Sequence, residues 1–162
     1  MHWETFNKSQ GQEEYRRKIN NLLLHYKNSY ELSANGEILQ KPEAGLEQIF
    51  DADLPSQDPN IVARMNSAVL QYRRYRSTID ERRQAVRDLA DILEYLRKQI
   101  KLFLTNQDEQ DLFNIANNFG IRHYNDKQKT AYDANIWLSW MFYFYLSTIH
   151  VVLRKIEEDS KK

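Results

Sequence analysis

The chain has 162 residues, enough for one domain with a sizeable hydrophobic core. Lysine plus arginine equal aspartate plus glutamate at 23 each, so the net charge points to neither nucleic acid nor an anionic membrane. The absence of cysteine excludes disulfides, thiolate metal sites and cysteine nucleophiles. The chain opens without a charged region followed by an apolar one, so we expect no secretory signal and a cytoplasmic protein.

Charge is distributed unevenly along the chain. Residues 1–57 carry six basic and nine acidic side chains, whereas residues 58–105 carry ten and six. An irregular stretch, DADLPSQDP, lies at the junction. We predict an N-terminal helix and β-hairpin in residues 1–57 and a helical bundle in residues 58–162. The two segments either form one compact domain or the first is an appendage.

The first 57 residues predict one helix, one hairpin and one short helix. From Gln12 to about Asn28, the apolar spacing i, i+4, i+7, i+8 is typical of an amphipathic helix. Tyr30–Gln40 alternates around Asn35-Gly36, a pair that favours a hairpin with a type I′ turn. Pro42 can begin a short helix that ends near Phe50. The apolar positions of the first helix are Tyr15, Ile19, Leu22, Leu23 and Tyr26.

Two long helices are predicted next. Asp58 followed by Pro59 is a typical helix start, because the aspartate oxygen caps and the missing N–H of proline costs nothing there. Ser77-Thr78 interrupts, and Thr78 with Glu81 forms the sequence of a capping box. From Ile79 to about Leu104, a near-heptad of apolar residues predicts one helix of about 39 Å.

The last third predicts a short helix, a polar loop and a long apolar helix. Asn106 can cap a helix that ends at Phe119, and Asp133 or Asn135 can cap the last one. Ile136–Leu153 contains 18 residues without a formal charge, but its serines, threonine, histidine and tyrosines favour a buried core helix over a membrane span. The predicted fold is therefore all-α, about five helices in a bundle with a small N-terminal β-hairpin.

The polar loop carries the residues best suited to chemistry. A guanidinium binds phosphate through a planar fork of donors, and a neighbouring imidazole can transfer a proton near neutral pH. Arg122 and His123 therefore suit metal-independent RNA cleavage, in which the 2′-hydroxyl attacks its own phosphate. The alternative is that both residues only tie the loop to helix ends. Side chains that would hold the substrate are Asn118, Asn125, Lys127, Gln128 and Lys129.

A second group of cations surrounds the break between the two long helices. Arg73, Arg74 and Arg76 could contact phosphates or an acidic partner, and Arg82 and Arg83 follow closely. The alternative is a solvated face, since several of these arginines have acidic residues at helical pair spacing.

The run LFNIANNFGIRHYNDKQKT…YD…IWLSWMFYFYLSTIHVVLR resembles the C-terminal part of bacterial helical proteins of the HEPN-like, abortive-infection type. The resemblance covers roughly residues 80–154. It implies a helical bundle, usually dimeric, and for many members a ribonuclease of a defence or toxin system. The family motif is an arginine followed, after four to six residues, by a histidine near the start of the last helix. Here no arginine has that spacing, and Arg122 is directly followed by His123.

Three functions stay open on this evidence. The first is an endoribonuclease or RNA-binding effector of antiviral defence that uses Arg122 and His123. The second is a non-catalytic interaction module or regulatory subunit of a defence complex. The third is a regulator that binds a nucleotide at the loop. We expect a homodimer through the apolar last helix, RNA or a defence-system protein as partner, no membrane, and neither cofactor nor metal.

Overall fold

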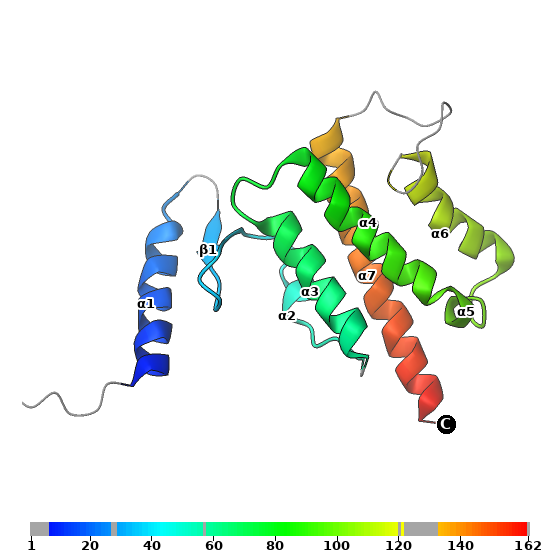
Figure 1. Cartoon of the computed structure of the whole chain (residues 1–162), viewed down its shortest axis with the longest axis horizontal. Helices are drawn as coiled ribbons and strands as arrows, with labels where there is room; N and C mark the ends of the chain where they lie inside the picture. The colour runs from blue at the N-terminus through cyan, green and yellow to red at the C-terminus, as the bar shows by residue number, and fades with distance from the viewer. Residues whose placement is uncertain (1–6, 27–28, 57, 120, 122–132, 162) are drawn as a thin grey trace, which may run out of the picture. The chain divides into compact units, whose positions relative to one another are not determined.

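A computed structural model describes residues 7–26, 29–56, 58–119, 121 and 133–161 (Figure 1). Over these residues the chain is mostly helical, as predicted, with seven helices and one two-stranded antiparallel sheet. Five of those helices have 13 residues or more. The chain separates into two compact units: Met1–Glu47 with Arg73–Arg76, and Gln48–Tyr72 with Ser77–Lys162. The division predicted after residue 57 stays a prediction.

The first unit contains α1 (Lys8–Leu23), β1 (Tyr30–Leu32) and β2 (Ile38–Gln40). Helix α1 begins after Asn7, whose side chain accepts a hydrogen bond from the backbone N–H of Gln10. Asn20 joins α1 to β1: its amide donates to the Leu32 carbonyl at 3.2 Å and its oxygen accepts the Leu32 N–H at 2.6 Å. On the side of β1 that does not pair with β2, these two bonds take the place of hydrogen bonds from another strand. Figure 1 shows β1 beside α1.

The hairpin was predicted correctly, but its turn type was not. Tyr30 pairs with Gln40 and Leu32 with Ile38, so the connection is longer than a two-residue type I′ turn. The Gly36 N–H donates to the Ser33 carbonyl, and Gly36 alone takes the left-handed conformation at φ +83°. Asn35 has no positive φ. This is a type I turn followed by a glycine, which gives a three-residue loop with a bulge.

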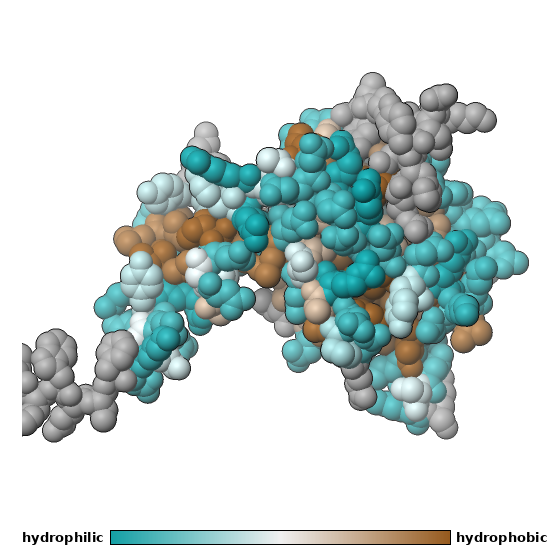
Figure 2. Space-filling view, in the orientation of Figure 1, coloured by the Kyte–Doolittle hydropathy of each residue, from teal (hydrophilic) through white to brown (hydrophobic). Residues whose placement is uncertain are grey.

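The first unit has almost no core of its own. Of its described hydrophobic side chains, Leu39 is the one that is buried, and α1 buries none. Leu22 and Leu24 remain exposed, and Figure 2 shows apolar surface gathered over the end of α1. The segment Arg73–Arg76 also contacts the hairpin, because the Tyr75 N–H donates to the Ile38 carbonyl at 2.9 Å.

The second unit holds the remaining helices, and side-chain caps mark where its long helices begin. The capping box of Thr78 and Glu81 is confirmed, Asp58 accepts the Asn60 N–H, and Thr105 rather than the predicted Asn106 caps its helix. The helices are α2 (Gln48–Asp51), α3 (Pro59–Arg73), α4 (Ile79–Tyr95), α5 (Arg97–Ile100), α6 (Asn106–Asn118) and α7 (Ala134–Ser160).

The single helix predicted from Ile79 to Leu104 is interrupted at Leu96. At this residue φ is −83° and ψ is 2°, so the backbone leaves the helical conformation and then begins the short α5. Leu96 itself is 3% exposed, and the helical turn that follows buries Ile100 completely. The apolar repeat predicted these burials correctly. It did not predict the bend, because apolar spacing continues through it.

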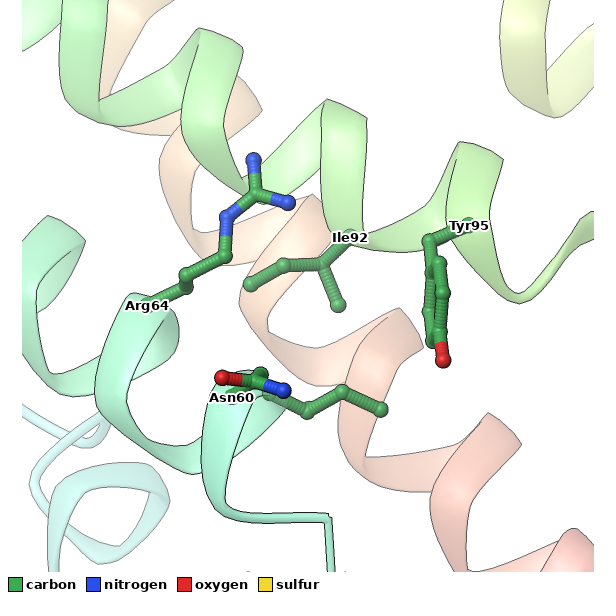
Figure 3. A pocket seen from close by; sticks show the side chains of 5 residues that line it. Asn60, Arg64, Ile92 and Tyr95 are labelled. Atoms are coloured by element: carbon green, nitrogen blue, oxygen red, sulfur yellow. The ribbon is translucent and has the colours of Figure 1, made fainter.

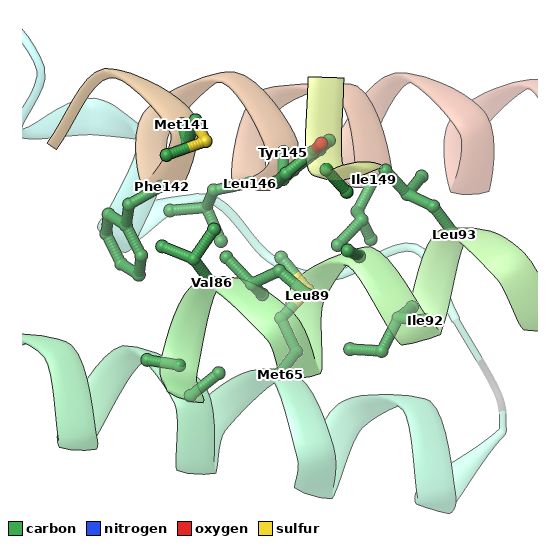
Figure 4. Packing of buried hydrophobic residues seen from close by; sticks show 14 of the residues in the cluster. Met65, Val86, Leu89, Ile92, Leu93, Met141, Phe142, Tyr145, Leu146 and Ile149 are labelled. Carbon is green, nitrogen blue, oxygen red and sulfur yellow. The ribbon is translucent and has the colours of Figure 1, made fainter. Parts of the chain in front are cut away.

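The core lies entirely in the second unit, and α7 packs along α4 at its centre. Figure 4 shows Phe142, Leu146 and Ile149 of α7 directed toward Val86, Leu89 and Leu93 of α4, with Met65 of α3 below. The Phe142 ring also stacks on Tyr72 with centroids 3.9 Å apart. α4 and α7 therefore each bury a continuous apolar face against the other, which is why both carry long apolar patterns.

Among the described helices, only α7 has the length and composition that would allow a membrane span. Half of its most apolar 18-residue window is buried inside the structure. The core helix of a folded domain passes the same test of length and composition. Its buried side carries Leu138, Met141, Phe142, Tyr145, Leu146, Ile149, Val152 and Leu153.

Core truncation at the α4–α7 contact should be far more costly than truncation at the surface. Leu89→Ala removes a side chain with no exposure and should lower the free energy of unfolding by about 2–5 kcal/mol. Leu102→Ala is the matched control, because Leu102 is 83% exposed and its loss should change stability by less than about 0.5 kcal/mol. Urea unfolding followed by circular dichroism measures both. Equal losses would contradict the packing described here.

Candidate functional site

The loop that carries the predicted site begins at a buried anchor. Ile121 is fully buried, and its N–H donates to the Ala116 carbonyl at the end of α6. Its own carbonyl accepts a 2.6 Å hydrogen bond from Nε of Arg87 on α4. A charged donor to a carbonyl next to a buried isoleucine holds the start of the loop against the second unit.

The other end of the loop is held by the cap of α7. The Asp133 carboxylate accepts the N–H groups of Asn135 at 3.0 Å and Ile136 at 3.3 Å, which confirms Asp133 as the cap. The predicted catalytic residues, Arg122 and His123, lie between these anchors and outside the described residues. The same holds for four predicted substrate-binding residues: Asn125, Lys127, Gln128 and Lys129.

One predicted substrate-binding residue of this region is described. Asn118 is the last residue of α6 and is exposed. Its place, three residues before the Ile121 anchor, puts its side chain on the surface at the point where the chain enters the loop.

Aromatic rings gather at both ends of the loop. Phe119 precedes it and Trp137 follows it, yet their ring centroids are 5.2 Å apart. Trp140 lies 5.6 Å from Trp137 and stacks with Phe144 at 5.5 Å. Trp137 is 39% exposed and Trp140 is 42% exposed. We refer to Phe119, Trp137, Trp140 and Phe144 as the aromatic cluster.

On the same helix Phe142 and Tyr145 are buried, whereas the two tryptophans are exposed. A signal for the exposure was present. Positions 137, 140, 144, 147 and 151 follow one helical stripe, and that stripe contains Ser147 and leads to Arg154. The high apolar content of α7 concealed this exposed stripe.

The structure separates the predicted arginine group by what each guanidinium contacts. Arg73 is 8% exposed, donates to the Glu31 carboxylate at 2.5 Å and to the Gln40 carbonyl at 3.0 Å. Arg74 forms a 3.0 Å ion pair with Glu37. Both therefore fasten the segment Arg73–Arg76 to the hairpin within the first unit, and Arg73 is committed to that structural role.

Arg76 differs from its two neighbours. It is exposed, it has a left-handed backbone with φ +62°, and its guanidinium lies 5.2 Å from the centroid of the Tyr75 ring. In the second unit, Arg83 pairs with Asp80 at 2.7 Å and Arg82 lies over the Tyr72 ring. The arginines thus do not present one continuous set of unpaired cations.

Two ion pairs of Arg97 join α4, α5 and α6. Glu109 is 5% exposed and accepts a hydrogen bond from Nε of Arg97, whose Nη1 donates to Glu94 at 2.9 Å. The guanidinium also covers the Phe113 ring at 4.5 Å. Hydrogen bonds to Glu94 and then to Glu109 raise the pKa of Arg97 above its usual value. Since every group here has a protein partner, this cluster is structural.

His150 is buried in α7, as predicted, but it is not fully satisfied. It is 7% exposed, and among the residues that the structure describes its Nδ1 has no hydrogen-bond partner. Burial, followed by the charge of Arg154, lowers the pKa of His150 below its usual value. The imidazole is therefore neutral in the folded protein at neutral pH.

The residues that the structure describes contain no group of three metal-binding side chains. No family model matches the chain, and comparisons with curated proteins and with solved structures gave no match. The resemblance to HEPN-like proteins therefore rests on the sequence run around the loop.

The buried imidazole predicts a loss of stability toward acidic pH. Because the folded-state pKa of His150 is depressed, its contribution is fully present above the unfolded-state value of about 6.5 and is lost as pH falls below it. His150→Gln should flatten the decline in unfolding free energy between about pH 7.5 and 5.5. Arg154→Gln should flatten it less, since it removes the smaller cause. Urea unfolding across this range measures the slope, and an unchanged slope in His150→Gln would contradict the prediction.

Proposed function

We propose that this chain is a HEPN-like helical protein that binds single-stranded RNA beside the loop 122–132 and cleaves it without metal. The proposal includes a helical bundle for the second unit. The observation that carries it is the aromatic cluster, which lies at both ends of a loop whose sequence is rich in cations and amides. Stacking rings beside positive charge are the combination that single-stranded nucleic acids require.

The proposed roles follow from residue chemistry. Trp137 and Trp140 stack bases, while Lys127 and Lys129 neutralise phosphates. Arg122 stabilises the charge that develops on the phosphate, and His123 transfers the proton. The two anchors, Ile121 with Arg87 and Asp133 at the cap, support the proposal because they hold both ends of the loop against rigid helices.

A second function is favoured by the same exposed face. Ile136 and Val151 of α7 are 64% and 65% exposed and extend the apolar stripe of the two tryptophans. Exposed apolar stripes of this kind often mark protein interfaces. In this alternative the stripe forms the homodimer seam or binds a protein of a defence complex, and the loop has no catalytic role.

Removal of the exposed rings should weaken RNA binding without unfolding the protein. Stacking contributes about 1–3 kcal/mol per base, so Trp137→Ala and Trp140→Ala should each weaken binding of a fluorescent single-stranded RNA by roughly 5- to 150-fold. Tyr15→Ala, which removes another exposed ring, is the control and should leave binding unchanged. Fluorescence anisotropy at fixed salt measures all three.

Cleavage tests the catalytic half of the proposal separately. Arg122→Ala and His123→Ala should each abolish cleavage of total RNA in EDTA while the unfolding transition stays as in the parent. If Trp137→Ala and Trp140→Ala lose RNA binding but the parent protein does not cleave RNA, the chain is an RNA-binding protein without catalytic activity. If the parent protein does not bind RNA, and its mass in solution rises with concentration but rises less in Trp140→Ala, the result supports the interface alternative.

A further inference from the structure

A small pocket opens in the second unit between α3 and α4. Its cavity volume is about 90 Å³. In Figure 3, Arg64 and Tyr95 stand on either side of Ile92, and Asn60 faces them from the start of α3. The five lining residues are Asn60, Ile61, Arg64, Ile92 and Tyr95. None of them was predicted as a site residue, and none belongs to the loop or the aromatic cluster.

The floor and the wall of this pocket are apolar. Ile61 is 5% exposed and Ile92 is 1% exposed, so each presents a small apolar surface to the cavity. Tyr95, by contrast, is 64% exposed, although its ring is large and apolar. An apolar body that entered the pocket would contact both isoleucines and cover one side of the tyrosine ring.

The polar groups at the rim of the pocket differ in charge from one side to the other. Arg64 is exposed, and among the described residues its guanidinium has neither a hydrogen bond nor an ion pair. Asn60 adds an amide on the same helix. On the side of Tyr95, the hydroxyl lies 3.5 Å from Oδ2 of Asp58, whose Oδ1 already accepts the Asn60 N–H at 2.9 Å. One end of the pocket is therefore cationic and the other carries a carboxylate.

We propose that this pocket binds a monoanionic carboxylate carried on a small apolar body. The carboxylate accepts the paired N–H groups of Arg64 and a hydrogen bond from the Asn60 amide, and the apolar body lies on Ile61 and Ile92 against Tyr95. Asp58 opposes a doubly charged phosphate more strongly than a single carboxylate. A cavity of about 90 Å³ can take a branched short chain and is too small to enclose a nucleotide.

This chemistry has two sources, a free short-chain acid or the C-terminal carboxylate of a peptide. Isobutyrate represents the first, and the peptide acetyl-Gly-Gly-Val with a free C-terminus represents the second. Their neutral counterparts are isobutyramide and the amidated peptide. Inorganic phosphate serves as the competing anion.

The test is a titration of ¹⁵N-labelled full-length protein followed by NMR. At least one carboxylate should produce saturable shifts confined to residues 58–65 and 91–96, with a dissociation constant of about 1–10 mM for so small a ligand. The neutral counterpart should produce none. Arg64→Gln should weaken binding at least tenfold, and Arg154→Gln, an exposed arginine on α7, should not weaken it.

The outcomes separate clearly because Arg64 and Tyr95 are exposed and their substitution should leave the fold intact. Tighter binding of the peptide than of isobutyrate identifies a peptide terminus as the natural ligand, and equal binding identifies a free acid. The proposal is overturned if neither carboxylate gives saturable shifts or if the neutral compounds give the same ones. Phosphate binding that equals carboxylate binding, or Arg64→Gln without effect, also overturns it.

Discussion

The contact between α4 and α7 is the constraint on which the second unit depends. Helix α7 is the most apolar helix described, and α4 supplies the apolar stripe that covers one of its faces, with Leu89 and Ile149 fully buried. One such partner cannot cover a helix that is apolar on nearly every side. The apolar surface of α7 that α4 does not cover carries the two tryptophans of the aromatic cluster and the exposed residues Ile136 and Val151.

This partial burial determines where function can be sought. The N-terminal end of α7 is rigid because Asp133 caps it, and Arg87 of α4 holds the entry to the loop at Ile121. The described residues on either side of residues 122–132 are therefore anchored on a packed helix pair, and loops that carry functional side chains are commonly supported by rigid elements of this kind. The proposed RNA site and the proposed carboxylate pocket both use α4 as their support, from Arg87 near the loop to Tyr95 at the pocket.

Much of the fold followed from local patterns, because capping and apolar period are properties of neighbouring residues. The capping box at Thr78, the Asp133 cap and the hairpin at Tyr30–Gln40 are of this kind. What sequence could not predict depends on tertiary contacts. Arg73 has the sequence of an available cation, and only the structure shows that Glu31 and Gln40 bind it. The exposure of Trp140 likewise follows only from the packing of α4 on the other side of α7. The interruption at Leu96 could not be predicted either, because the apolar spacing continues unchanged through it.

The most direct test of this account compares two neighbouring positions on α7. Val151 is 65% exposed and Val152 is 2% exposed, and the chain contains no cysteine of its own. Single Val151→Cys and Val152→Cys variants can therefore be labelled with a water-soluble maleimide under native conditions and again in denaturant. The account predicts rapid labelling of Val151→Cys and protection of Val152→Cys until the protein unfolds. Equal native labelling rates, whether both fast or both slow, would show that α7 is not packed on α4 with one face open.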